Sequence, residues 1–172
     1  MSGGPVLVVG YGSTLRGDDA VGWRAAELLG ADPRLPGVEV LARQQLTPEL
    51  AEDLSRAALV VLVDAREQPG AAGAVSVGRV APARGRAPWS HRLDPAALLA
   101  LCAELYGPPP PVFLVSVGAA SFGAGEPLSP PVRRALPEVA DAVAGIIKEQ
   151  LGGPGSSRSE AVAPRSQEHR RA

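Results

Sequence analysis

Cysteine and histidine are scarce in this chain. Its 172 residues include one cysteine, Cys102, and two histidines, His91 and His169. A single cysteine excludes an intramolecular disulfide and a zinc cluster made of several cysteines, and such sparse use is typical of a reducing compartment. We therefore expect a cytoplasmic protein.

An excess of charge and long apolar segments are also missing. The formal net charge is -1 and the pI is about 6.1, whereas proteins that bind nucleic acid usually carry a basic face. No apolar segment reaches the roughly 18 residues that suggest a membrane span, and the N-terminus lacks the pattern of an export signal. We therefore expect neither nucleic acid nor a membrane as a partner, and we expect a monomer.

Unbroken apolar runs predict the central strands of a parallel sheet. Residues 6–9, 59–63 and 112–117 are mostly β-branched or aliphatic without polar alternation, as in strands that are buried on both faces. Residues 38–41 and 74–80 predict two further strands, the second at an edge of the sheet because it contains a glycine.

Helical periodicity alternates with these strands. A helix is expected from residue 18 to Gly30, a second from Thr47, whose hydroxyl would cap it, to about Arg56, and a third after Asp94. Ser129 begins a last segment that Pro137 is expected to break or restart. The predicted buried stripes consist of Val21, Ala25, Leu28 and Leu29; of Leu98, Leu101, Cys102 and Leu105; and of Val139, Val143, Ile146, Ile147 and Leu151.

This alternation predicts a three-layer α/β/α sandwich with a mostly parallel central sheet of about five strands. Residues 1–151 would form one domain. Residues 152–172 are rich in Gly, Pro, Ser and Arg without an apolar period, and we expect a flexible C-terminal tail there. In such folds ligands bind at the carboxyl ends of the strands, so the loops that follow the strands are the candidate sites.

The loop after the first strand lies within the stretch VLVVGYGSTLRGDDAVG at residues 6–22. It does not fit a nucleotide site. Leu15 stands where the dinucleotide pattern G-x-G-x-x-G has its third glycine, and no Gly-Lys-Ser/Thr of a phosphate loop is present. Asp18 and Asp19 at the start of the next helix would also repel a phosphate group. One of the two acids satisfies the helix N-terminus, and the other is either solvated or functional.

Two further residues are candidates for the same edge of the sheet. Asp64 directly continues a buried apolar strand, where a carboxylate loses hydration and needs a cation or several hydrogen-bond donors. His91 follows a Pro- and Arg-rich loop, and a lone histidine is either structural or a ligand. Together with an acid of the first loop, these residues would form a mixed oxygen and nitrogen site suited to a divalent metal such as nickel or zinc.

Nucleophilic catalysis has little support in the sequence. Cys102 lies on the apolar stripe of a predicted helix, so we expect it in the core. A set of serine, His91 and Asp64 is conceivable, but the G-x-S-x-G motif of a nucleophile elbow is not present.

Three motifs of this chain resemble the maturation endopeptidases of nickel-iron hydrogenases. They are VLVVGYGSTLRGDDAVG at residues 6–22, LVVLVDA at residues 59–65 and WSHRLDPAALLAL from residue 89, in the order and approximate spacing of that family. The resemblance spans residues 6 to about 151. Its first motif, a strand followed by Gly-x-Gly-Asn/Ser, a short loop and Asp-Asp/Glu-x-x-Gly, is fairly specific.

The resemblance implies a metal-recognition site made of Asp19, Asp64 and His91. Members of the family cleave a C-terminal extension from the hydrogenase large-subunit precursor after nickel has been loaded, so the divalent metal belongs to the substrate. The resemblance implies no catalytic nucleophile, and the general base is left open.

The loop after the second predicted strand departs from a well-known branch of the family. That branch has Asp-Gly-Gly/Thr, whereas this chain reads Arg43-Gln44-Gln45-Leu46-Thr47. We expect Gln44, Gln45 and Thr47 to contact the substrate. The alternative function is a non-catalytic assembly chaperone that recognises the metal site on the same scaffold.

Overall fold

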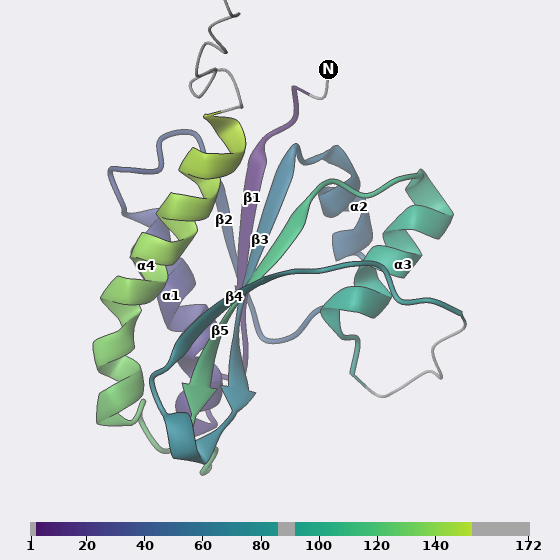
Figure 1. Ribbon diagram of the computed structural model, residues 1–172. Helices are drawn as coiled ribbons and strands as arrows, with labels where there is room; N and C mark the ends of the chain where they lie inside the picture. The colour runs from purple at the N-terminus through teal and green to yellow at the C-terminus, as the bar shows by residue number, and fades with distance from the viewer. Residues whose placement is uncertain (1–2, 86–91, 153–172) are drawn as a thin grey trace, which may run out of the picture.

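A twisted five-stranded sheet forms the centre of the molecule. The computed structural model describes residues 3–85 and 92–152 (Figure 1). The strand order is β2-β1-β3-β5-β4, in which β4 alone is antiparallel to its neighbour and lies at the edge, as its glycine predicts. The strands are β1 Val6–Tyr11, β2 Glu39–Arg43, β3 Leu59–Glu67, β4 Val75–Arg79 and β5 Val112–Ala119.

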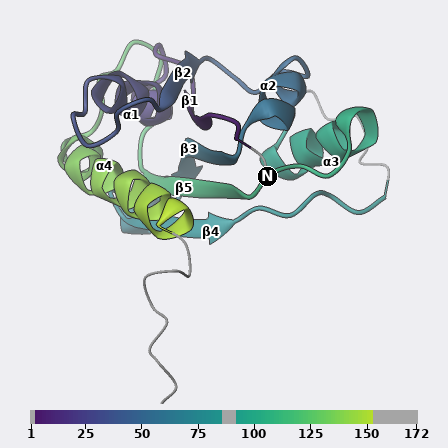
Figure 2. The same cartoon turned by 90° about the horizontal axis from the view of Figure 1, so that it is seen from above.

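Two helices cover each face of the sheet. The pair α1 (Val21–Gly30) and α4 (Pro130–Leu151) packs on one face, and the pair α2 (Leu50–Arg56) and α3 (Pro95–Tyr106) packs on the other (Figures 1 and 2). The prediction of a three-layer α/β/α sandwich with a mostly parallel sheet is therefore confirmed.

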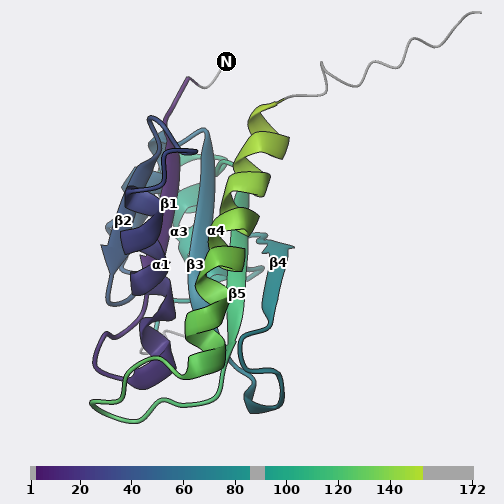
Figure 3. The same ribbon diagram turned by 90° about the vertical axis from the view of Figure 1, so that its left-hand side faces the viewer.

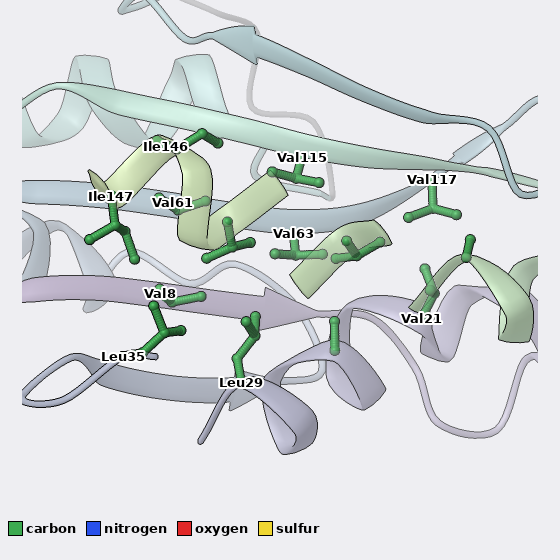
Figure 4. Close-up of a cluster of buried hydrophobic side chains, with 14 of the residues drawn as sticks. Val8, Val21, Leu29, Leu35, Val61, Val63, Val115, Val117, Ile146 and Ile147 are labelled. Carbon is green, nitrogen blue, oxygen red and sulfur yellow. The ribbon is translucent and has the colours of Figure 1, made fainter. Parts of the chain in front are cut away.

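Each helical layer closes its own apolar core. Between the sheet and the α1/α4 layer, Val8, Val61 and Val115 of the strands meet Leu29 and Ile146 of the helices (Figure 4). The opposite core lies under α2 and α3 and contains Cys102, which is fully buried, as predicted. Because every second residue of a strand points to the same face, the apolar runs of β1 and β3 supply both cores.

Pro137 does not break the last helix. Helix α4 runs without interruption over 22 residues, so the expected break is wrong. A proline inside a helix removes the bond from its own nitrogen to the carbonyl four residues earlier, here that of Arg133. Both residues lie on the exposed side of the helix, where water can satisfy that carbonyl, while the buried Val132 and Val139 continue the apolar stripe across the site.

The predicted stripes are correct at their centres and wrong at some ends. Leu28, Leu105 and Leu151 were expected to be buried, but they are exposed. Leu105 and Leu151 lie in the last turn of their helices, whereas Leu28 faces solvent beside the buried Leu29. Thr47 also does not cap α2, because the helix begins at Leu50 and its N-cap residue is Glu49 without a side-chain cap.

The topology places several loops at one edge. The parallel strands β1, β2, β3 and β5 all end at the same side of the sheet, at the bottom of Figure 1.

Among the described residues, no helix has both the length and the apolar character needed to cross a bilayer.

Candidate metal-recognition site at the carboxyl edge of the sheet

The loop after β1 folds back tightly before the chain enters α1. Gly12 has a φ of +146°, and a Cβ at this position would lie 1.8 Å from the carbonyl oxygen of Asp19. The Gly12 N–H donates to the carbonyl of Arg43 at 3.0 Å, which fixes the loop to the end of β2. The glycine pair of the opening motif therefore serves a sharp exit from the strand and a close backbone approach, as the failed phosphate patterns indicate.

Asp19 lies in the short 3-10 helix η1 (Gly17–Ala20) that precedes α1. Its side chain is partly buried, and its Oδ2 accepts the N–H of Ser13 at 2.9 Å. This is the one hydrogen bond to the Asp19 carboxylate from the part of the chain that the structure describes. No other described residue donates a hydrogen bond to the remaining lone pairs of this carboxylate.

Asp64 lies inside β3 and not at its end, because the strand continues to Glu67. The last pair between β3 and β1 is Val63 with Gly10, whereas β3 remains paired with β5 through Asp64 and Ser116. From Asp64 onward, β3 is thus no longer paired with β1. The predicted location at the edge of the sheet is correct, although the predicted strand end is not.

Burial raises the pKa of Asp64 to about 6. The N–H of Ala65 donates to Oδ1 at 2.7 Å and the hydroxyl of Tyr11 donates a second hydrogen bond, and both lower the pKa. The negative charge of Asp19 raises it, whereas the positive charge of Arg92 lowers it. The two predicted acids are therefore close enough to interact, and the donors around Asp64 do not compensate for its desolvation.

Tyr11 is a site residue that sequence reasoning missed. It ends β1, is only 8% exposed, and donates its hydroxyl hydrogen bond to Asp64. Burial raises its pKa far above the ordinary value, and the charges of Asp64, Asp94 and Asp19 add to this shift. A tyrosine between two glycines at a predicted strand end was an available signal, because tyrosine is scarce in this chain and its hydroxyl needs a partner when buried.

Asp18 does not cap α1. The N-cap residue of α1 is Ala20, and no side chain caps this helix. The Asp18 carboxylate is 0% exposed and instead accepts hydrogen bonds from the loop between β5 and α4. Burial alone would raise its pKa, but hydrogen bonds from Ser129, Ala120 and Ser121 outweigh burial and hold the pKa of Asp18 below its usual value.

The other predicted site residues are His91, Gln44, Gln45 and Thr47, and the roles of all the predicted site residues stay predictions. His91 lies outside the described residues, as does the predicted tail from residue 153 onward. Residues 3–85 and 92–152 contain no group of three His, Cys, Asp or Glu side chains arranged to hold a metal ion. Gln44 and Gln45 are exposed directly after β2 at the same edge, and the hydroxyl of Thr47 bonds to the Glu49 carboxylate.

Solved structures provide the comparison with known proteins. The maturation protease HycI of NiFe hydrogenase from Thermococcus kodakarensis has a TM-score of 0.67 and 26% identity, covering 86% of this chain and 95% of its own. The hydrogenase maturating endopeptidase HybD from E. coli has a TM-score of 0.69 and 22% identity over 85% of this chain and 93% of its own.

A third similar structure is a hydrogenase 2 maturation peptidase from a Thaumarchaeota archaeon. It has a TM-score of 0.58 and 22% identity over 86% of this chain and 98% of its own. Neither the sequence families nor the curated proteins that were compared gave a match. The chain thus has the fold of the NiFe hydrogenase maturation proteases over most of its length, which confirms the resemblance found in its motifs.

Proposed function

We propose that this chain is a cytoplasmic endopeptidase that removes the C-terminal extension of a nickel-loaded hydrogenase large-subunit precursor. The observation that carries the proposal is the convergence of Asp19 and Asp64 at the carboxyl edge of the sheet, on the fold of proteases that mature hydrogenases. Sparse cysteine and the absence of a motif for a nucleophile fit the same proposal.

The metal in this proposal arrives with the precursor and is part of the substrate. Asp19 and Asp64 would contact it with carboxylate oxygens, and His91 would contribute an imidazole nitrogen. A partly buried carboxylate with few donors, such as Asp64, gains more from a divalent cation than a fully hydrated one does. Two oxygens and one nitrogen form a ligand set that nickel accepts.

The proposed reaction is hydrolysis of one peptide bond. Water adds to the scissile carbonyl carbon, the C–N bond breaks, and the leaving amine takes up a proton. A divalent ion beside the scissile carbonyl polarises it or lowers the pKa of the attacking water, so no side chain needs to act as the nucleophile. Cys102 agrees with this scheme because it is fully buried in the core under α3.

The loop after β2 is proposed to contact the precursor. Gln44 and Gln45 are exposed. They lie beside the loop that carries Asp19, because the Gly12 N–H donates to the carbonyl of Arg43. Their amide groups would bind the backbone of an extended peptide, with Thr47 at the end of this short surface.

The test is to mix the purified protein with the large-subunit precursor, with and without nickel, and to follow the mass of the precursor's C-terminus. Loss of the extension only when nickel is present is the expected result. Stable binding without a change in mass would identify the protein as the chaperone and contradict the proposal. Asp53→Asn, at an exposed acid of α2, is a matched control that should process normally.

A further inference from the structure

The buried carboxylate of Asp18 joins two loops that are far apart in the sequence. Its Oδ2 accepts the N–H of Ala120 at 3.0 Å, the N–H of Ser121 at 3.1 Å and the hydroxyl of Ser129 at 2.9 Å. Its Oδ1 accepts the N–H of Ser129 at 2.7 Å. The carboxylate is 0% exposed, so these donors replace its hydration completely.

Backbone contacts strengthen the same connection. The N–H of Asp18 donates to the Ser121 carbonyl at 2.7 Å, and the N–H of Gly125 donates to the Leu15 carbonyl at 2.8 Å. Gly17 has a φ of +53°, and a Cβ there would lie 2.7 Å from the Ser121 carbonyl oxygen. The loop after β1 thus rests on the loop between β5 and α4, which lie together at the bottom of Figure 3.

The position of Asp19 depends on this connection, because only one described hydrogen bond holds its own carboxylate. It follows Asp18 in the η1 turn, and its carboxylate is held by the single N–H of Ser13 described above. A rotation of η1 about its axis would move Asp19 relative to Asp64, which is fixed in the sheet by its pairing with Ser116. The four bonds to Asp18 oppose that rotation.

We propose that Asp18 is a positioning residue that fixes the Asp19 carboxylate opposite Asp64. This inference rests on the proposed function, since the position of Asp19 matters for processing only if Asp19 meets the substrate's metal. A carboxylate is required at position 18 because it accepts from donors on both oxygens. An asparagine keeps the size but presents its own N–H groups to at least one of those donors.

The first experiment reads the position of Asp19 without any substrate. Amide hydrogen exchange is measured at Ser13, whose N–H bonds to Asp19, in the wild type and in Asp18→Asn. We expect exchange at Ser13 to become about tenfold faster in the variant, while amides in the centre of β3 change only with global stability. The control Val143→Ala opens a cavity under α4, away from both loops. It should speed amide exchange at Ser13 by no more than its loss of global stability predicts.

The second experiment measures processing of the nickel-loaded precursor well below the unfolding temperature of each variant. Asp18→Asn should lower kcat by about a hundredfold, because a displacement of about 1 Å at a reacting centre has that effect. KM for the precursor should stay within about threefold, since the exposed loop after β2 is unchanged. Val143→Ala, matched in unfolding temperature, should keep the wild-type kcat.

The outcomes separate the two proposals. If Ser13 exchanges at the wild-type rate in Asp18→Asn, or if Val143→Ala lowers kcat as much, the positioning role is wrong. If the wild type does not process the precursor but Ser13 is released in Asp18→Asn, the proposed function fails and the positioning of Asp19 stands. Should Asp18→Asn not fold, Ser129→Ala removes one of the four donors and should give a smaller change of the same kind, about threefold in both readouts. No change in either readout would overturn the inference.

Discussion

The carboxyl edge of the sheet holds two aspartates in contrasting environments. Asp18 is fully buried and accepts four hydrogen bonds, and its pKa is lowered. Asp64 is partly exposed and accepts bonds from Ala65 and Tyr11, and its pKa is raised to about 6. The carboxylate with no solvent-exposed surface is therefore the one whose pKa is lowered.

Donors and a neighbouring charge both contribute to this difference. Burial penalises the charged form of both carboxylates, but four hydrogen bonds outweigh it at Asp18. At Asp64 burial outweighs two hydrogen bonds, and the negative charge of Asp19 raises the pKa further. A carboxylate whose acceptor sites are filled has no further ligand to bind and serves the structure. A carboxylate that lacks donors gains from a cation, which is why Asp64 and not Asp18 belongs to the proposed site.

The largest effect on processing is expected when the charge of Asp64 is removed. Asp64→Asn should lower processing by about a thousandfold, which corresponds to about 4 kcal/mol, because a neutral amide is a poor partner for the metal of the proposed substrate. Stability at pH 7 should be unchanged or higher, since the variant no longer buries a charge short of donors. Urea unfolding together with the C-terminal mass assay measures both effects. A normally active Asp64→Asn would contradict the assignment.

Removal of the Asp18 carboxylate, unlike that of Asp64, should lower stability. Asp18→Ala leaves the donors of Ala120, Ser121 and Ser129 without their acceptor, and we expect a loss of about 3 kcal/mol in the free energy of unfolding. Urea denaturation monitored by circular dichroism measures it. The exposed Asp53→Ala should change stability by no more than about 0.5 kcal/mol. Equal stability of Asp18→Ala and the wild type would show that the buried network contributes nothing.

Acid should weaken the Asp18 network specifically. Because the pKa of Asp18 in the folded state lies below its ordinary value of 3.8, its contribution is complete above that value and is lost as the pH falls through the folded-state pKa. Asp18→Asn cannot titrate at this position. The stability difference between the wild type and Asp18→Asn should therefore be constant from neutral pH to about pH 5 and shrink towards pH 3. Urea unfolding at several pH values measures it, and a difference that does not change with pH would refute the lowered pKa.

Most of the fold could be predicted because it depends on patterns that are local in the sequence. The apolar runs at residues 6–9, 59–63 and 112–117 all became central strands, and the alternation with helices gave the three layers. The predictions failed where contact with solvent or the end of the sheet determines whether a helix continues or a side chain is buried. Pro137 is tolerated because its side of α4 faces water, and Leu151 is exposed because α4 is longer than the core beneath it.

The site could be predicted only in part, because its hydrogen bonds join residues far apart in the sequence. Spacing left Asp18 and Asp19 with the same possible roles, a helix cap, a solvated acid or a functional acid. Asp18 is neither a cap nor solvated, since its partners lie in the loop between β5 and α4, more than 100 positions away. No local pattern indicates that pairing. The resemblance selected Asp19 and Asp64, but it gave no indication of Tyr11.

The smallest effect is expected from Tyr11→Phe. This substitution removes one of the two hydrogen-bond donors of Asp64 and retains the buried ring. We expect a loss of about 1 kcal/mol in unfolding free energy and about a tenfold lower processing rate, because Asp64 becomes less well oriented. The matched control is Tyr106→Phe at the end of α3, where the side chain is 51% exposed and should be neutral in both measurements. If Tyr11→Phe behaves like Tyr106→Phe, the hydroxyl does not hold Asp64, and the backbone N–H of Ala65 together with the sheet suffices to orient it.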